Sequence, residues 1–85
     1  MTLCDLEKAQ CGVVTHFSDE NVGLVTRLRE IGFAEGDRVQ VMHFGLFGKN
    51  PLTVRLNGAL IALRRREAKL ISVRLETEDI ASNAL

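Results

Sequence analysis

Residues 52–63 read Leu-Thr-Val-Arg-Leu-Asn-Gly-Ala-Leu-Ile-Ala-Leu and carry the strongest structural signal in the chain. Asn57-Gly58 lies between two β-like runs, and this dipeptide is preferred at the centre of a two-residue type I′ hairpin turn. Such a turn fixes the register of both strands. One face then pairs apolar residues only, namely Leu56 with Ala59, Val54 with Ile61 and Leu52 with Leu63, while the other pairs Arg55 with Leu60 and Thr53 with Ala62. A slip of one residue would destroy this agreement, so the sequence predicts a hairpin in this register.

A helix is predicted before the hairpin, over residues 22–31. Residues 18–21 supply short oxygen-bearing side chains that can cap its first amides, and the apolar residues that follow have helical spacing: Leu24, Val25, Leu28 and Ile31. Gly32 comes next and can take the left-handed conformation that ends a helix, because it has no Cβ. Phe33 then stands where a Schellman motif packs an apolar residue against the last turn, here against Leu28. We therefore expect Gly32 to be a structural residue.

Period-two alternation predicts two further strands, over residues 11–17 and 38–44. In the first strand, Phe17 is expected to share a face with Val13 and Thr15, and His16 to lie on the surface of the other face. In the second strand, simple alternation puts His43 on the same face as Val39 and Val41. We expect its ring at the end of a barrel, with a hydrogen-bond partner.

The remaining segments complete a mainly β fold. Residues 34–37 form a turn with Gly36 at a position that needs positive φ, residues 64–68 predict a short helical turn, and residues 70–74 predict a last strand. Five short strands need closure, because an open sheet would leave long edges and half a core. We predict a small five-stranded SH3-like barrel over residues 1–75. One helix is inserted between the first two strands, a helical turn precedes the last, and residues 76–85 form an acidic, flexible tail.

Composition excludes several classes of protein. Hydrophobic residues make up 46% of the 85 residues, which is typical of a folded chain. Eleven basic and eleven acidic residues give a net charge of zero, so the chain lacks the basic excess of many nucleic-acid-binding proteins. No apolar run approaches the roughly 20 residues of a membrane span, and charged residues at positions 5, 7 and 8 exclude a signal-peptide core. Two cysteines outside any C-x-x-C pair suggest reduced thiols and a cytoplasmic protein.

The chain offers little for catalysis, because it has no glycine-rich phosphate loop and no Ser/His/Asp set of recognisable spacing. We expect neither an enzyme nor a cofactor site. Weak candidates for binding Fe²⁺ or another transition metal are scattered and form no C-x-x-C or H-x₃-H arrangement: Cys4, Cys11, His16 and His43, with Asp19 and Glu20 beside the first histidine. The triplet Arg64-Arg65-Arg66 points in different directions at the end of a strand. We therefore expect no nucleic-acid surface there.

A glycine-bracketed loop, residues 45–51, holds two apolar residues, Leu46 and Phe47. Apolar residues at a loop tip either fold back over the barrel opening or contact a partner. The polar helix face around Arg27 is the other accessible surface, and its ordinary interpretation is a solvated face. The candidate partner-binding residues are therefore Leu46, Phe47 and Lys49 in the loop and Arg27 in the helix. Gly32, Gly36, Asn57 and Gly58 are the expected structural positions.

Four segments together resemble the ferrous-iron transport protein A family. Residues 27–39 read Arg-Leu-Arg-Glu-Ile-Gly-Phe-Ala-Glu-Gly-Asp-Arg-Val, residues 61–68 read Ile-Ala-Leu-Arg-Arg-Arg-Glu-Ala, and shorter matches lie at residues 2–6 and 71–73. The resemblance implies an SH3-like barrel in a bacterial cytoplasm that does not insert into the membrane. It implies binding to the GTPase-bearing cytosolic part of the ferrous-iron transporter B, as a regulator or as an assembly factor. Ala9-Gln10 stands where members commonly have a glycine before the first strand.

Two other functions stay open at this point. The same barrel type occurs as the C-terminal domain of iron-dependent repressors, which would make the chain an iron-linked transcriptional regulatory module. The sequence contains no helix-turn-helix segment, so DNA recognition would need another protein. A small metal-binding protein that uses the cysteines and histidines is the third possibility. None of the three interpretations fixes an oligomeric state.

Overall fold

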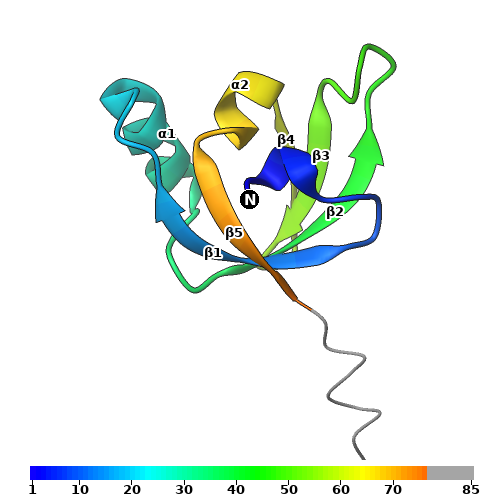
Figure 1. Cartoon of the computed structure of the whole chain (residues 1–85), viewed down its shortest axis with the longest axis horizontal. Helices are drawn as coiled ribbons and strands as arrows, with labels where there is room; N and C mark the ends of the chain where they lie inside the picture. The colour runs from blue at the N-terminus through cyan, green and yellow to red at the C-terminus, as the bar shows by residue number, and fades with distance from the viewer. Residues whose placement is uncertain (77–85) are drawn as a thin grey trace, which may run out of the picture.

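Five antiparallel strands form one curved sheet in the order β4-β3-β2-β1-β5, with helix α1 inserted between β1 and β2 (Figure 1). The computed structural model describes residues 1–76. Its elements are the 3₁₀ helix η1 (Leu3–Asp5), β1 (Cys11–Phe17), α1 (Val22–Ile31), β2 (Arg38–Phe44), β3 (Leu52–Leu56), β4 (Ala59–Leu63), α2 (Arg65–Ala68) and β5 (Ile71–Glu76). The predicted mainly β, SH3-like fold is confirmed. No helix in the described part of the chain is long and apolar enough to cross a membrane.

The hairpin between β3 and β4 has the predicted register at all five pairs, from Leu56 opposite Ala59 to Leu52 opposite Leu63. Asn57 and Gly58 both have positive φ, at 51° and 83°, as a type I′ turn requires. Strand β5 runs to Glu76, two residues beyond the predicted end, because Glu76 still pairs with Cys11 of β1. The rest of the predicted acidic tail, residues 77–85, lies outside the described residues.

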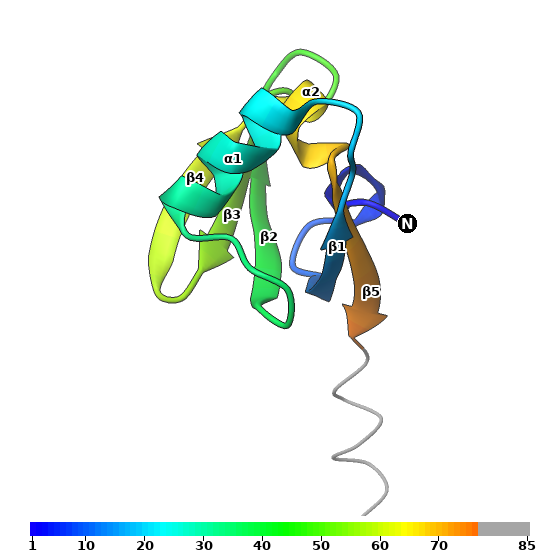
Figure 2. The ribbon, with the colours of Figure 1, turned by 90° about the vertical axis from the view of Figure 1, so that its left-hand side faces the viewer.

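Helix α1 ends as the sequence predicts. The amide of Gly32 donates to the carbonyl of Arg29 at 3.1 Å, and the amide of Phe33 donates to the carbonyl of Leu28 at 3.1 Å, which is the Schellman pattern. Gly32 has φ of 132°, and the side chains of Phe33 and Leu28 are fully buried. Figure 2 shows α1 lying over one opening of the barrel, beside β4 and β3. Ile31, which shares the helical spacing of the buried positions, is nevertheless 44% exposed.

Two β-bulges overturn the simple alternation expected in β1 and β2. The registers shift between Val14 and His16 and between Val41 and His43, so Thr15 and Met42 are extra residues in their strands. Phe17 therefore packs against the core on the side of Val14, not on the side of Thr15. His43 is exposed opposite Thr53 without a hydrogen-bond partner among the described residues, so the face and the hydrogen bond predicted for its ring were wrong, whereas His16 lies on the surface as expected.

The core contains only apolar side chains, and no polar or charged side chain among the described residues is buried. The N-terminal segment makes a contribution that the alternation pattern does not reveal. Leu3 and Leu6 are fully buried, and the Thr2 hydroxyl accepts a hydrogen bond from the Cys4 amide at 3.3 Å to begin η1. The carbonyl of Met1 accepts a hydrogen bond from the Val73 amide at 2.9 Å. The N-terminus thus fills the barrel and covers part of the β5 edge.

An exposed ion pair joins α1 to the turn that follows it. The Arg29 guanidinium donates hydrogen bonds of 2.9 Å and 2.8 Å to the two oxygens of the Glu35 carboxylate. It also lies over the Phe17 ring, 4.3 Å from the centroid. These hydrogen bonds lower the pKa of Glu35 to about 2 and raise the pKa of Arg29. The pair therefore connects the end of α1 to β1 through an aromatic contact and to the turn before β2 through a carboxylate.

Replacing Gly32 with valine should lower the free energy of unfolding by about 1–2 kcal/mol or more, because a β-branched residue is strained at this positive φ. Urea unfolding followed by circular dichroism would measure the loss. Gly23→Ala in the same helix is the matched control, since its new methyl group meets only the Asn21 side chain at an ordinary 3.7 Å. That control should be neutral or stabilising. Equal destabilisation by both variants would contradict the role given to Gly32.

The stabilising effect of the Arg29–Glu35 pair should depend on pH in a defined window. Because folding lowers the pKa of Glu35 from 4.5 to about 2, the contribution is complete above pH 4.5 and disappears as the pH falls toward 2. Wild type and Glu35→Gln should therefore differ in stability at pH 6 and converge near pH 2. Urea unfolding across this range would measure the difference, and 1 M salt should reduce it. A difference that does not change with pH would contradict this role.

Candidate partner-binding surface

The loop of residues 45–51 projects from the barrel on a narrow neck. The Gly45 amide donates to the carbonyl of Pro51 at 2.7 Å, and a Cβ on Gly45 would lie only 2.3 Å from the Asn50 carbonyl oxygen. Only glycine therefore allows the two sides of the neck to come this close. Figure 1 shows the loop rising beyond the ends of β2 and β3. Leu46 is 94% exposed and Phe47 is 83% exposed, so neither side chain folds back over the barrel opening.

Lys49 connects the loop to the body of the barrel. Its ammonium group lies 4.9 Å from the centroid of the Phe44 ring and 3.6 Å from a carboxylate oxygen of Glu7. Both contacts are on the surface, where each contributes little to stability. Gly48 and Lys49 both have φ of 63°, which returns the chain toward β3. Lys49 thus lies at the base of the loop, with its side chain 43% exposed.

Arg27 does not join the loop in one surface. It is exposed on α1, and the structure gives it no ion pair within the described residues. Figures 1 and 2 place α1 and the β2–β3 loop on different sides of the barrel. The four predicted partner-binding residues therefore divide into a loop group of three and an isolated helical arginine.

The four weak candidates for metal binding lie apart. Cys4 is half-buried beside α2, with its Sγ 3.5 Å from the carbonyl oxygen of Arg65, whereas Cys11 begins β1 opposite Gln40 and Glu76. The Nδ1 atom of His16 lies 3.3 Å from the Thr15 hydroxyl at the other end of β1. Within residues 1–76, no three Cys, His, Asp or Glu side chains come close enough to share a metal ion. The candidate metal-binding residues are therefore not gathered into one site by the fold.

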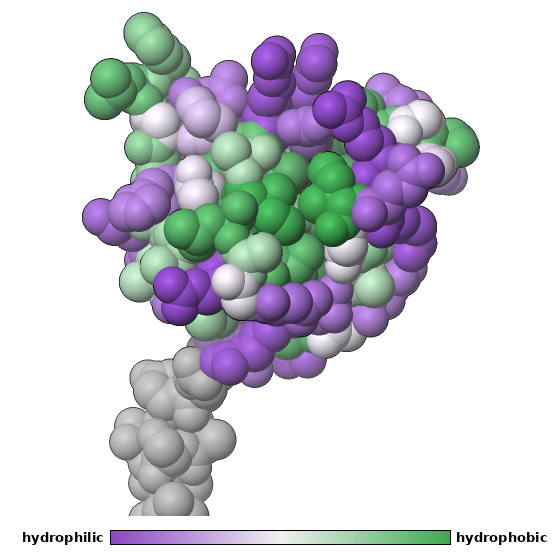
Figure 3. Space-filling model, turned by 180° about the vertical axis from the view of Figure 1, so that it is seen from behind, coloured by the Kyte–Doolittle hydropathy of each residue, from purple (hydrophilic) through white to green (hydrophobic). Residues whose placement is uncertain are grey.

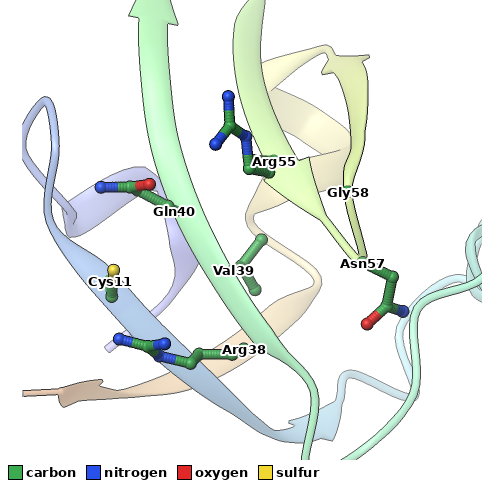
Figure 4. A pocket seen from close by; sticks show the side chains of 7 residues that line it. All are labelled: Cys11, Arg38, Val39, Gln40, Arg55, Asn57 and Gly58. Atoms are coloured by element: carbon green, nitrogen blue, oxygen red, sulfur yellow. The ribbon is translucent and has the colours of Figure 1, made fainter.

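A shallow depression lies on the outer face of the sheet, lined by Cys11, Arg38, Val39, Gln40, Arg55, Asn57 and Gly58 (Figure 4). The Arg38 guanidinium forms an ion pair with Glu76 beside it. Figure 4 shows the side chains of Arg38, Gln40 and Cys11 on one side, while Arg55 and Asn57 extend in other directions. The polar groups do not converge on one point, so the depression does not have the arrangement of a small-molecule site.

A second exposed apolar surface lies on β4 and was not among the predicted binding residues. Leu60 is 58% exposed on the outer face of this strand, opposite Arg55. The hairpin register already placed Leu60 on the mixed face with Arg55. That pairing was the available signal of an apolar side chain outside the core.

Solved structures of other proteins share this fold. A manganese-dependent transcriptional repressor in complex with manganese is 22% identical, with a TM-score of 0.82, over 89% of this chain and 36% of the repressor chain. At that identity the likeness concerns the fold alone. No curated protein sequence matches the chain.

Two FeoA proteins are more similar to the chain in sequence than this repressor is. FeoA of Stenotrophomonas maltophilia, solved with zinc and described as an SH3 domain protein proposed as a ferrous iron transport activating factor, is 36% identical with a TM-score of 0.77, over 87% of this chain and 89% of that one. FeoA of Chlorobium tepidum is 30% identical with a TM-score of 0.81, over 91% and 71%. The FeoA domain model matches residues 1–75, so the chain belongs to the FeoA domain family.

Proposed function

We propose that the chain is a cytoplasmic accessory protein of bacterial ferrous-iron uptake, which binds the cytosolic GTPase-bearing part of the ferrous-iron transporter B and regulates or assembles it. Family membership links the chain to ferrous-iron transport, and FeoA domains are accessory and not enzymatic. The observation that carries the proposal is the exposure of Leu46 and Phe47 at the tip of the neck-bound loop. A non-enzymatic domain must act through a surface, and this loop has the chemistry of a contact site.

The energetics of the loop favour a protein partner. Two large apolar side chains in water gain about 1.5–3 kcal/mol each when they are fully buried. The short neck between Gly45 and Pro51 restricts the loop, so less conformational entropy is lost on binding than for a free segment. An apolar centre with a nearby cation is also the usual arrangement of a binding hot spot and its rim. We assign the central contact to Leu46 and Phe47, and a rim contact to Lys49.

Arg27 takes a separate role in this proposal. Since α1 lies away from the loop, a single small contact cannot include both. A partner that reaches Arg27 must extend around the barrel, and Arg27 would then contribute mainly to the rate of association through its charge. Fe²⁺ itself is not assigned a site within residues 1–76, because no three Cys, His, Asp or Glu side chains there come close enough to share a metal ion.

The loop assignment predicts that Leu46→Asp combined with Phe47→Asp leaves the fold intact and weakens binding at least tenfold, since two buried apolar contacts would be replaced by charges. Binding to the purified GTPase-bearing part of the transporter can be measured by calorimetry and by NMR titration. Val22→Asp is the matched control, because it places a charge on another highly exposed apolar residue, away from the loop on α1.

Two results would contradict the assignment. Unchanged affinity of the double variant would place the contact elsewhere on the barrel. A large loss of thermal stability would show that the loop residues support the core, although they are almost fully exposed. Chemical shift changes in the wild-type chain should cluster on residues 45–51.

A further inference from the structure

Within residues 1–76, strand β4 is an edge of the sheet and pairs with β3 alone. In a hairpin closed by a two-residue turn, Leu56 and Ala59 form a hydrogen-bonded pair, and hydrogen-bonded and non-bonded pairs alternate from there. The amides and carbonyls of Ala59, Ile61 and Leu63 therefore face β3. Those of Leu60 and Ala62 face outward, and neither residue makes a backbone hydrogen bond outside the ladder within the described part of the chain.

The two edges of the sheet differ in how they are protected against the addition of another strand. On β5, the amide of Val73 donates to Met1, Thr2 forms a bridge with Ser72, and the strand carries Arg74 and Glu76. Strand β4 reads Ala-Leu-Ile-Ala-Leu and has no charge, no proline and no bulge. Charged side chains, prolines and bulges normally prevent an edge strand from pairing with another strand. The β4 edge is therefore open both in its hydrogen bonding and in its side chains.

An apolar surface continues from this edge toward α1. Figure 3 shows apolar residues gathered in the middle of the face seen from behind, the side on which Figures 1 and 2 place β4. We call this the β4 surface; it comprises the exposed residues Leu60 and Ala62 of β4 and Ile31 of α1. Leu60 is 58% exposed and Ile31 is 44% exposed. The end of α1 lies near the hairpin, since a Cβ on Gly32 would be 4.0 Å from the Leu56 side chain.

The charges around the β4 surface indicate which occupant it suits. Arg55 lies opposite Leu60 on the outer face, and Arg64 and Arg66 follow the strand. All three are exposed, and none has an ion pair within residues 1–76. If two copies of the chain paired through β4, both would bring these arginines to one interface, and like charges would oppose the contact. A segment with acidic residues would be attracted by the same charges.

We propose that the β4 edge accepts an extended acidic segment of the partner protein as a sixth strand of the sheet, with its apolar side chains on the β4 surface. The proposal rests on the proposed function, because it takes the partner to be the cytosolic part of the transporter. Strand addition would satisfy the amides and carbonyls of Leu60 and Ala62, and side-chain contacts would select the segment. The loop of residues 45–51 and the β4 edge would then be two separate contacts.

Amide hydrogen exchange of the chain bound to the GTPase-bearing part of the transporter provides a specific test. The amides of Leu60 and Ala62 should exchange at least tenfold more slowly in the complex. The amides of Ala59, Ile61 and Leu63 should change little, because they are already bonded to β3. Exchange of Leu60 and Ala62 at the same rate in the free and bound chain would overturn the proposal.

The variant Ala62→Pro removes an outward-facing amide and leaves the hydrogen bonds to β3 in place. Proline is tolerated at such a position of an edge strand. Ala62→Pro should weaken binding about tenfold, whereas Ala62→Val, which keeps the amide, should change it less than threefold. Circular dichroism checks the fold of each variant. Leu60→Asp provides an independent disruption if the proline variant unfolds, since it removes an exposed apolar contact and places a negative charge where the acidic segment would lie.

The outcomes separate this proposal from the proposed function. If the Leu46→Asp, Phe47→Asp double variant loses binding while Ala62→Pro and Leu60→Asp bind like wild type, the proposed function stands and strand addition is overturned. No binding by the wild-type chain would overturn both. Slow exchange of Leu60 and Ala62 that appears without partner, and increases with protein concentration, would assign the edge to a second copy and overturn the acidic segment. An affinity for the GTPase-bearing part of the transporter that falls as the salt concentration is raised would support the acidic segment.

Discussion

The apolar interior of the barrel is the constraint on which the rest of the structure depends, because a polar side chain buried there without a hydrogen-bond partner would be destabilising. No polar side chain in the described chain is buried, so every strand must present its apolar residues inward along its whole length. The hairpin register achieves this in β3 and β4 without adjustment. Strands β1 and β2 need one extra residue each, at Thr15 and Met42, to bring Phe17 and Phe44 toward the core. The remaining space is filled from outside the sheet by the N-terminal segment and by α1.

The same constraint explains why the proposed contact surfaces consist of apolar residues that the core does not use. A small barrel offers few positions for a deep site, and within residues 1–76 no three Cys, His, Asp or Glu side chains come together. Leu46 and Phe47 on the loop and Leu60 on β4 are the large apolar side chains most clearly excluded from the interior by local geometry. The neck excludes the first two, and strand alternation excludes the third. Contact with other proteins is the chemistry that such a surface can perform.

Local signals in the sequence predicted much of the fold. Asn57-Gly58 and Gly32 determine turn geometry within a few residues, so the hairpin register and the end of α1 could be derived correctly. The bulges could not, because an extra residue in a strand is favoured by packing between strands that are distant in sequence. For the same reason the position expected for His43 was wrong. Of the two proposed contact surfaces, the loop is suggested by its apolar residues between glycines, whereas the open edge depends on strand order, which alternation does not reveal.

The neck of the loop has an evolutionary consequence. Because the Gly45 amide and the Pro51 carbonyl close the loop at its base, the tip residues Leu46 and Phe47 contribute little to the packing of the barrel. Substitutions and insertions there should alter recognition at little cost in stability. Relatives with the same core could therefore diverge rapidly in this segment as their partners change. The loop could also be exchanged between relatives to transfer specificity, provided that the glycine at its base is kept.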